Sequence, residues 1–258
     1  MSLAACAALV ERGDPDRFAA VMAAPVWCRV RLFPLYAFNL EVARAPWVTQ
    51  EAMIAEMRLQ WWRDTVEMMA GGGAVRAHEV VGPLAEVVRG QGLPLDVMDR
   101  LIAARRWDIY RDGFADPGAL DGYLEDTGAG LMWLAARALG AGDAVEQVAR
   151  DAGWAAGLAA FLRAVPELEA RGRVPLLDGR EAAVAELARR GLERLRRARA
   201  GRGGMPRAVA PAFFSGWQTE GLLTLAVREP GRVAEGRLAL SGFARKGGLL
   251  WLSMRGKW

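Results

Sequence analysis

The sequence has few of the residues that build most metal sites and nucleophilic triads. Its 258 residues include one histidine, His78, and two cysteines, Cys6 and Cys28. A single histidine excludes sites that need a second one, and the two cysteines do not have the spacing of metal ligands. We therefore predict that both thiols are reduced and buried as small apolar side chains, and that His78 is a lone surface residue.

Long apolar runs are also missing. Although 53% of the residues are hydrophobic, no run reaches the ~18 residues that a membrane-spanning helix requires. Residues 1–18 contain acids and arginine too early for a secretory signal peptide. We expect a cytoplasmic chain that can also associate with a membrane.

The charge balance is basic without pointing to one partner. The net charge is +4 and the sequence pI is about 9.6, with the excess carried by arginine rather than lysine. This allows contact with phosphates or with an anionic membrane surface and identifies neither. We predict no nucleic-acid partner.

Strand patterns are nearly absent, because alanine, leucine, arginine and glutamate recur at spacings of three and four residues instead of alternating. Asp14-Pro15 and Asp116-Pro117 each place an N-cap acid before a proline at the first helical position. The pattern predicts an all-α chain in which residues 1–258 form a single domain, a helical bundle around one interior where a ligand would bind. We expect helices near residues 15–24, 26–44, 49–70, 76–90, 95–112, 118–139, 142–168, 180–200, 206–229 and 232–252.

Two stretches carry a recognisable pattern. One is "PVWCRVRLFPLYAFNLEVARAPW" at 25–47, and the other is "GWAAGLAAFLRAVPELEARGRVPLL" at 153–177. They resemble the squalene and phytoene synthase family, all-helical enzymes that join two prenyl diphosphates head to head. The resemblance covers roughly residues 14–177 and implies an isoprenoid-synthase-type bundle around a central cavity. The matching residues are Pro25, Arg29, Tyr36, Ala37 and Phe38 in the first stretch, and Gly153, Ala155, Leu158, Leu162, Arg163, Val165, Glu167 and residues 171–174 in the second.

The chemistry of that family depends on two DxxxD motifs on facing helices. Residues four apart share one face of a helix, so each pair of carboxylates can hold Mg²⁺ ions that bridge and neutralise the diphosphate. Carried over position by position, the first pair falls at Ala43 and Trp47 and the second at Ala164 and Leu168. All four aspartates are absent, so the resemblance implies no catalytic residue and no metal ligand at these positions.

Neighbouring acids are poor substitutes for the missing aspartates. Glu41 lies two residues before Ala43, which turns it ~200° away on a helix, and Glu167 lies ~100° from Leu168. Other acids that could line the interior, without forming a pair four residues apart, are Asp64, Asp108, Glu125 and Asp126. We therefore expect no cofactor, and Mg²⁺ only if the chain is a divergent prenyl transferase.

One branch of the family has lost the same acids. The sequence "AFNLEVA" at 37–43 resembles the AFNxExA pattern of complex I assembly factors with this fold, which also have an aromatic pair near the position of "RLQWW" at 58–62. This resemblance implies a pseudoenzyme that binds respiratory complex I subunits or assembly proteins. The alternatives are a divergent head-to-head prenyl transferase and a protein that binds a prenyl diphosphate or another lipid.

Several side chains are candidates for binding an anion or an isoprenoid, because guanidinium groups suit phosphate oxygens and aromatic rings suit apolar chains. The candidates are Arg29, Tyr36, Arg58, Trp62, Arg163, Arg171 and Arg173. For Arg163 an ion pair with Glu167, four residues on, is favoured over ligand binding. For Arg171 and Arg173 neither interpretation is favoured, and core packing is favoured for both Trp61 and Trp62.

The expected helix at 180–200 is strongly basic. Seven arginines lie between Arg189 and Arg202 against one acid, Glu193. Such a helix can rest on an anionic membrane surface. Its arginines can equally be a solvated face, with the stripe of Leu187, Leu192, Leu195 and Ala198 turned to the core, and this interpretation is favoured. The tail "GGLLWLSMRGKW" is compatible with either.

Overall fold

The computed structural model describes residues 2–71, 76–255 and 258, and this part of the chain contains no strand, which confirms the predicted all-α fold. The α-helices are α1 (Leu3–Gly13), α2 (Pro15–Ala23), α3 (Val26–Arg44), α4 (Ala52–Ala70), α5 (Val81–Gln91), α6 (Leu95–Ala104), α7 (Pro117–Leu124), α8 (Gly130–Ala138), α9 (Glu146–Ala170), α10 (Glu181–Gly201), α11 (Thr219–Arg228), α12 (Gly231–Ala234) and α13 (Gly242–Arg255). Segments of 3-10 or π helix lie at Ala45–Trp47, Arg105–Asp108, Glu125–Ala129, Asp143–Val145, Arg202–Gly204 and Arg207–Gly216.

The two aspartate–proline pairs begin helices as predicted. The Oδ1 atom of Asp14 accepts a hydrogen bond from the backbone N–H of Arg17 at 2.9 Å, and Asp116 caps α7 through Ala119 at the same distance. Each cap satisfies a backbone donor that the first helical turn leaves without a partner.

Several expectations about helix boundaries were wrong. The expected helix at 76–90 begins at Val81, and the one at 95–112 ends at Ala104 and continues only as a short 3-10 segment. Helix α1 was not predicted, although Ser2 caps it and its apolar side pairs with α3. The expected helix at 206–229 is a 3-10 segment followed by α11, and Pro211 in that segment has no N–H to donate. The expected helix at 232–252 is divided into α12 and α13, because the chain turns at Gly236, whose φ is +66°.

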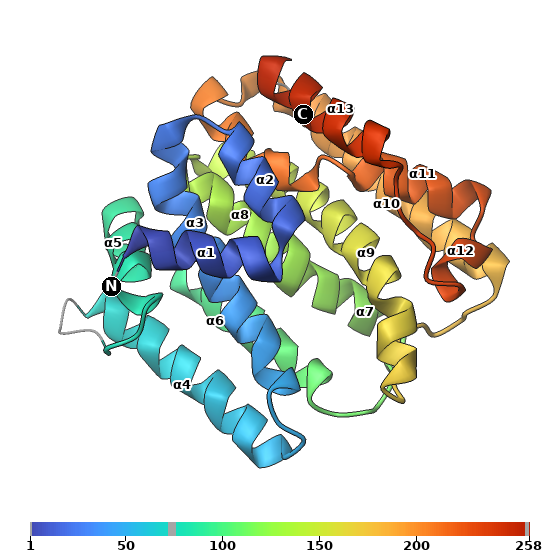
Figure 1. Cartoon of the computed structure of the whole chain (residues 1–258), viewed down its shortest axis with the longest axis horizontal. Coiled ribbons are helices and arrows are strands. Elements are labelled where there is room, and N and C mark those ends of the chain that lie inside the picture. The colour runs from blue at the N-terminus through green and yellow to red at the C-terminus, as the bar shows by residue number, and fades with distance from the viewer. Residues whose placement is uncertain (1, 72–75, 256–257) are drawn as a thin grey trace.

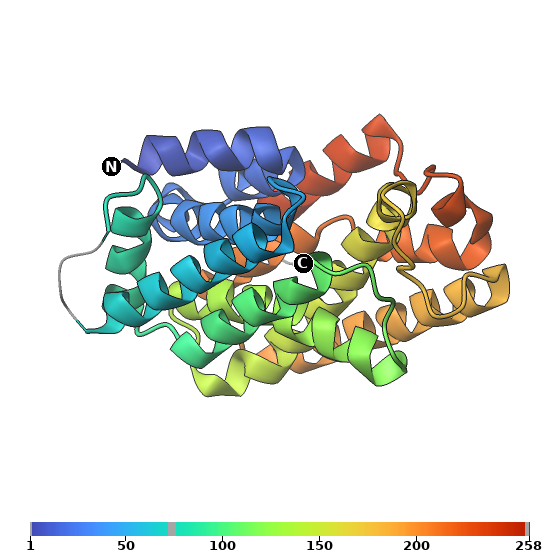
Figure 2. The same cartoon turned by 90° about the horizontal axis from the view of Figure 1, so that it is seen from below.

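The helices form a bundle in which segments distant in sequence meet. Helices α4 and α5 lie at one end of the long axis and α10 to α12 at the other, with α3, α8 and α9 between them (Figures 1 and 2). One cluster of buried side chains joins α3, α5, α6 and α8, and a second joins α9, α10 and α11. This arrangement places the C-terminal end of α3 opposite the later turns of α9.

A π-helical segment, Glu125–Ala129, packs closely on α9. A Cβ atom added at Gly153 would lie 2.5 Å from the Cβ atom of Met132 and 2.6 Å from the carbonyl oxygen of Gly128. These distances are shorter than real carbon contacts, so the approach requires glycine at position 153. The close contact fixes one wall of the cavity described next.

Candidate functional site

A central cavity of about 470 Å³ lies between α3 and α9. Its wall includes Ala43 and Trp47 from the end of α3 and the segment after it, and Ala164 and Leu168 from α9. All four positions of the family's aspartates therefore face one space, as their four-residue spacing predicts. The cavity is present, but the positions of the family's metal ligands carry apolar or aromatic side chains.

Magnesium needs several oxygen ligands at one point, and this cavity does not provide them. Among the described residues its carboxylates are Asp108 and Glu167. Glu167 is ion-paired with Arg171, and Asp108 accepts hydrogen bonds from Arg105 and Tyr123. No group of three histidine, cysteine or acidic side chains anywhere in the described part of the chain could hold a metal ion. The residues present do not fit the magnesium cluster that the family pattern requires.

The other acids considered as substitutes lie away from the cavity wall. Glu41 lines a separate groove beside α4, in agreement with its rotation from Ala43 on the helix. The remaining three are ion-paired with arginines: Asp64 with Arg76, Asp126 with Arg100, and Glu125 with both Arg150 and Arg194.

The guanidinium groups of two arginines lie against the ring of Trp47. The guanidinium carbon of Arg171 lies 4.5 Å from the ring centroid, and that of Arg173 lies 5.7 Å from it. Arg173 also lies 4.4 Å from the ring of Trp107 and is only 6% exposed. Because a guanidinium group is attracted to the face of an indole ring, both arginines of the "RGR" motif already have a partner within the protein.

A buried polar cluster closes the cavity beside these rings. Tyr123 accepts a hydrogen bond from Nη1 of Arg105 at 2.8 Å and donates one to Oδ2 of Asp108 at 3.1 Å, while Nη1 of Arg173 donates to the carbonyl oxygen of Asp108 at 2.8 Å. Burial raises the pKa of Asp108 and Tyr123 and lowers that of Arg173. Burial also disfavours the charge of Arg105, but Tyr123 and Asp108 beside it outweigh this and raise its pKa. The Tyr123 hydroxyl and the Asp108 carboxylate are thus hydrogen-bonded within the cluster, as expected of a structural cluster, whereas the buried Nε atoms of Arg105 and Arg173 have no hydrogen-bond partner among the described residues.

Sequence reasoning missed several polar residues of the cavity wall, including Arg105, Tyr123 and Asn39. Asn39 is 5% exposed, lines the cavity, and its Oδ1 atom accepts no hydrogen bond from the described residues. It lies four residues before Ala43, so the same helical spacing that placed Ala43 could have identified it. A buried amide oxygen without a donor is costly, so a bound molecule with a hydrogen-bond donor would be favoured at this point.

The sequence of this chain is similar to a family of known proteins over most of its length. The family model described as squalene/phytoene synthase matches residues 10–176. This chain belongs to the squalene/phytoene synthase family. The predicted family is thereby confirmed.

Curated relatives of this squalene/phytoene synthase family member include complex I assembly factors. It is 28% identical over 171 residues to "NADH dehydrogenase (ubiquinone) complex I, assembly factor 6" of Bos taurus, covering 66% of this chain and 51% of that protein. It is 30% identical over 178 residues to the homolog of that factor in Drosophila melanogaster, covering 67% of this chain and 53% of the relative. The chain therefore spans about half the length of the curated relatives it matches.

Solved structures with the same fold include two synthases. Squalene synthase HpnC from Alicyclobacillus acidocaldarius has a TM-score of 0.64 at 17% identity, covering 98% of this chain and 94% of the other. A dehydrosqualene synthase in complex with ligand has a TM-score of 0.68 at 12% identity, covering 98% and 95%. At these identities the likeness shows the fold alone, and it confirms the predicted isoprenoid-synthase-type bundle.

The structure distributes the seven candidate ligand-binding residues of this family member over several places. Arg171 lines the central cavity, whereas Tyr36 and Arg163 line a smaller adjoining cavity of about 140 Å³. The expected ion pair between Arg163 and Glu167 is wrong, because Arg171 holds Glu167. Arg163 pairs instead with Asp16 of α2 at 3.4 Å, which the helix packing brings within reach.

The remaining candidates lie outside the central cavity. Arg29 is half-buried and donates a hydrogen bond to the backbone carbonyl of Met22 near the end of α2. Arg58 and Trp62 line the groove beside α4 with Trp61 and His78, and the 4% exposure of Trp62 confirms core packing for that ring. The prediction that His78 has no partner was wrong, because its ring centroid lies 5.4 Å from that of Trp61 and 5.3 Å from that of Trp62.

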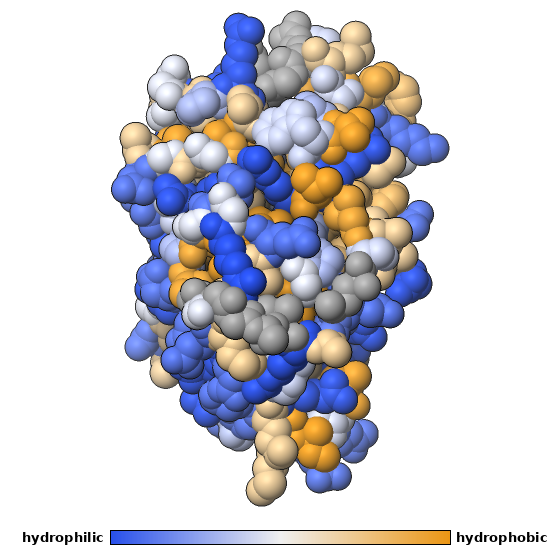
Figure 3. Space-filling view, turned by 90° about the vertical axis from the view of Figure 1, so that its left-hand side faces the viewer, coloured by the Kyte–Doolittle hydropathy of each residue, from blue (hydrophilic) through white to orange (hydrophobic). Residues whose placement is uncertain are grey.

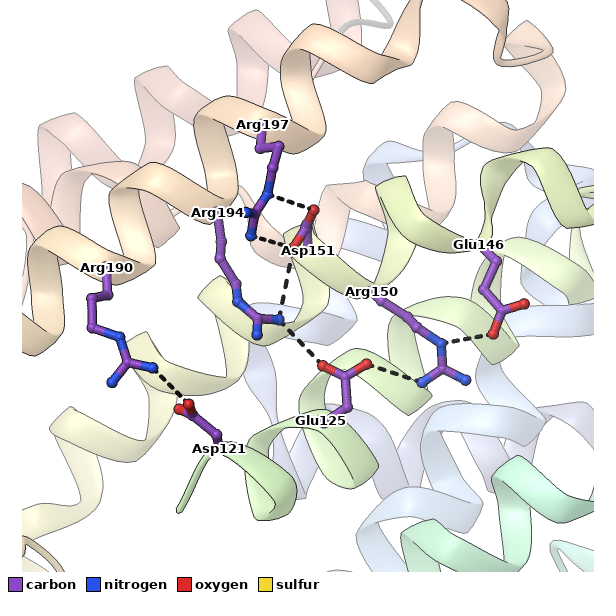
Figure 4. Close-up of polar contacts among 8 residues, drawn as sticks. All are labelled: Asp121, Glu125, Glu146, Arg150, Asp151, Arg190, Arg194 and Arg197. Carbon is purple, nitrogen blue, oxygen red and sulfur yellow. Dashed lines mark hydrogen bonds and ion pairs between the residues drawn. The ribbon is translucent and has the colours of Figure 1, made fainter. Parts of the chain in front are cut away.

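The basic helix α10 is held by acids from other elements. Figure 4 shows three of its arginines pointing toward carboxylates of α7, α9 and the π segment between α7 and α8. The pairs are Arg190 with Asp121 at 2.6 Å, Arg194 with Glu125 at 3.2 Å, and Arg197 with Asp151 at 3.0 Å. Arg189 and Arg199 pair with Glu186 and Glu220, respectively. Much of the positive charge that the sequence shows is therefore balanced locally.

The apolar stripe of α10 is turned inward, which confirms the favoured interpretation of this helix. Ala198 is buried in the first core cluster and Leu195 in the second, and Leu187 and Leu192 pack against the second. Contact of residues 180–200 with a membrane stays a prediction. None of the described helices is both long and apolar enough to cross a bilayer.

Proposed function

We propose that this chain is a non-catalytic member of the squalene/phytoene synthase family that binds partner proteins during assembly of respiratory complex I. One observation carries the proposal: Ala43, Trp47, Ala164 and Leu168 line the cavity where the family's metal ligands would be. The names of the curated relatives support the assignment to complex I. The partners would be subunits or other assembly proteins of that complex.

The expected loss of reaction rate favours this proposal over prenyl transfer. Removing a single preorganised electrostatic group typically lowers a rate by ~10²–10³. Both carboxylate pairs are absent here, and the carboxylates that remain in the cavity, Asp108 and Glu167, are engaged with arginine or tyrosine. Binding of diphosphate through magnesium would be lost together with its activation.

Gene deletion tests the proposal directly. Without the protein, the amount of assembled complex I should fall while carotenoid and hopanoid contents stay unchanged, and the wild-type gene should restore the complex. Loss of those isoprenoids with normal complex I would contradict the proposal and favour a prenyl transferase.

A purified sample provides a second test. With farnesyl or geranylgeranyl diphosphate and magnesium, the protein should form no head-to-head product. Calorimetry should detect no metal-dependent diphosphate binding, whereas micromolar, magnesium-dependent affinity would favour the divergent transferase.

The cavity supports a second candidate function, the binding of an isoprenoid or other lipid without metal. It is open, largely apolar, and contains the unpartnered amide oxygen of Asn39. Solvent extraction and mass spectrometry of purified protein should then recover an apolar ligand with a hydrogen-bond donor. The variant Ala164→Phe, which fills the cavity, should lose that ligand, whereas Ala182→Phe at an exposed position of α10 should retain it. An empty wild-type protein would count against this function.

A further inference from the structure

The outer face of α13 exposes large apolar side chains. This helix runs along the outside of the bundle and packs against α2 (Figures 1 and 2). Phe243 is 91% exposed, Leu250 62% and Met254 76%. Spacings of seven and four residues place these three side chains on one side of the helix, as an exposed apolar strip.

Core packing does not account for this strip, because α13 has a second apolar side that is buried. Leu252 is 7% exposed and packs in the core with Leu249 beside it. Gly248 lies against the ring of Trp217, and Arg245 forms an ion pair with Asp16 of α2. The helix is therefore held to the bundle by one side while the strip faces outward.

The charge around the strip indicates what it would contact. After Glu235 the chain contains no acid and five basic residues: Arg237, Arg245, Lys246, Arg255 and Lys257. Arg237 and Arg245 have acidic partners, and Lys246 is exposed on α13 itself. A helix with an apolar face and a basic flank is complementary to a bilayer whose headgroups are negatively charged.

Two other surfaces do not combine an exposed apolar face with basic residues that lack acidic partners. The arginines of α10 are balanced by acids such as Asp121 and Asp151, as described above. An exposed apolar patch on α4, formed by Met53, Ile54 and Met57, is accompanied by acidic residues, including Glu51 and Glu56. Helix α4 begins at the lower end of the face in Figure 3, where apolar atoms lie among hydrophilic ones.

We propose that α13 binds the surface of an anionic phospholipid membrane. Phe243, Leu250 and Met254 enter the boundary between headgroups and acyl chains, and Lys246 lies at the level of the phosphates. The helix remains in the plane of the surface. This inference does not depend on the function proposed above, because it concerns a face outside the cavity.

Vesicle co-sedimentation of the full chain tests the inference. The protein should bind vesicles of phosphatidylcholine mixed with phosphatidylglycerol, bind vesicles of phosphatidylcholine alone much more weakly, and be released by salt. The double variant Phe243→Ser and Leu250→Ser should bind the anionic vesicles at least about tenfold more weakly, because two apolar contacts are lost. Lys246→Glu should weaken binding to anionic vesicles and leave the weak binding to neutral ones unchanged.

A matched control uses the other apolar patch. Met53 and Met57 are 76% and 66% exposed, so Met53→Ser with Met57→Ser removes two comparable side chains and should leave vesicle binding unchanged. All the variants change exposed residues, and thermal unfolding checks that they fold. Failure of the wild type to bind anionic vesicles, or an equal loss in the α4 variant, overturns the inference. So does a wild-type dimer that Phe243→Ser and Leu250→Ser dissociate, because the strip would then join two copies of the chain.

Discussion

The guanidinium carbon of Arg171 lies 4.5 Å from the centroid of the Trp47 ring. Trp47 occupies a position where the squalene/phytoene synthase pattern has an aspartate that holds magnesium, and Arg171 belongs to the motif that a diphosphate could otherwise contact. The indole ring of Trp47 attracts the guanidinium group directly, whereas an aspartate at this position would bind a metal ion that contacts the substrate. The same substitution thus removes a metal ligand and gives a nearby arginine a partner within the protein.

We expect this contact to contribute measurably to stability. In a double-mutant cycle of Trp47→Leu and Arg171→Gln, the coupling free energy of unfolding should be about 0.5–1 kcal/mol. The control cycle combines Trp47→Leu with Arg180→Gln, whose guanidinium pairs with Asp178, and should give no coupling. Urea unfolding measures both cycles, and equal coupling energies would show that the ring does not stabilise Arg171.

The two cysteines give a prediction about alkaline pH. Cys6 and Cys28 are fully buried, and burial raises the pKa of each thiol from 9.0 to about 11. Between these values the folded protein holds protons that the unfolded chain releases, so the free energy of unfolding should fall as pH rises from about 9 to about 11. A Cys6→Ala and Cys28→Ala variant should show a shallower decline.

Thiol labelling provides an independent check of the same burial. A thiol reagent at pH 8 should label neither cysteine in the folded protein and both in denaturant. Rapid labelling of Cys6 or Cys28 under native conditions would contradict the structure.

The close contact between the π segment and α9 predicts opposite effects of two alanines. Gly153→Ala should lower the free energy of unfolding by about 1–3 kcal/mol, because the new methyl group would overlap Met132 and the Gly128 carbonyl. Gly122→Ala in α7 should raise it by about 0.4–1 kcal/mol, since that position has open space. Thermal or urea unfolding distinguishes the two, and equal effects would argue against the close approach.

The acids that hold α10 should differ in importance according to their burial. Asp151 is 2% exposed and accepts two hydrogen bonds from Arg197, so Asp151→Asn should lower the free energy of unfolding by about 1.5–3 kcal/mol. The control Glu186→Gln removes an exposed partner of Arg189 and should change it by less than about 0.5 kcal/mol. A similar small effect of both variants, measured by urea unfolding, would show that the network in Figure 4 contributes little.

Part of the candidate site was predictable because helical geometry is local. The positions of Ala43 and Trp47 on one face, and the orientation of Glu41 away from it, follow from about 3.6 residues per turn. The resemblance placed Ala164 and Leu168 opposite them, and the structure has all four in one cavity wall. Asn39 lies on that same face and was missed only because its position was not considered.

The sequence by itself determined the helical class, the family and the loss of both aspartate pairs, since each depends on residue identity at short spacings. Only the tertiary structure decided that Arg163 pairs with Asp16, that α10 is held by Asp121 and Asp151, and that α13 presents Phe243 to solvent. The physical reason is that spacing along a helix fixes the direction of a side chain from its own axis. Which group it meets depends on how distant helices pack, and that is set by burial over the whole chain.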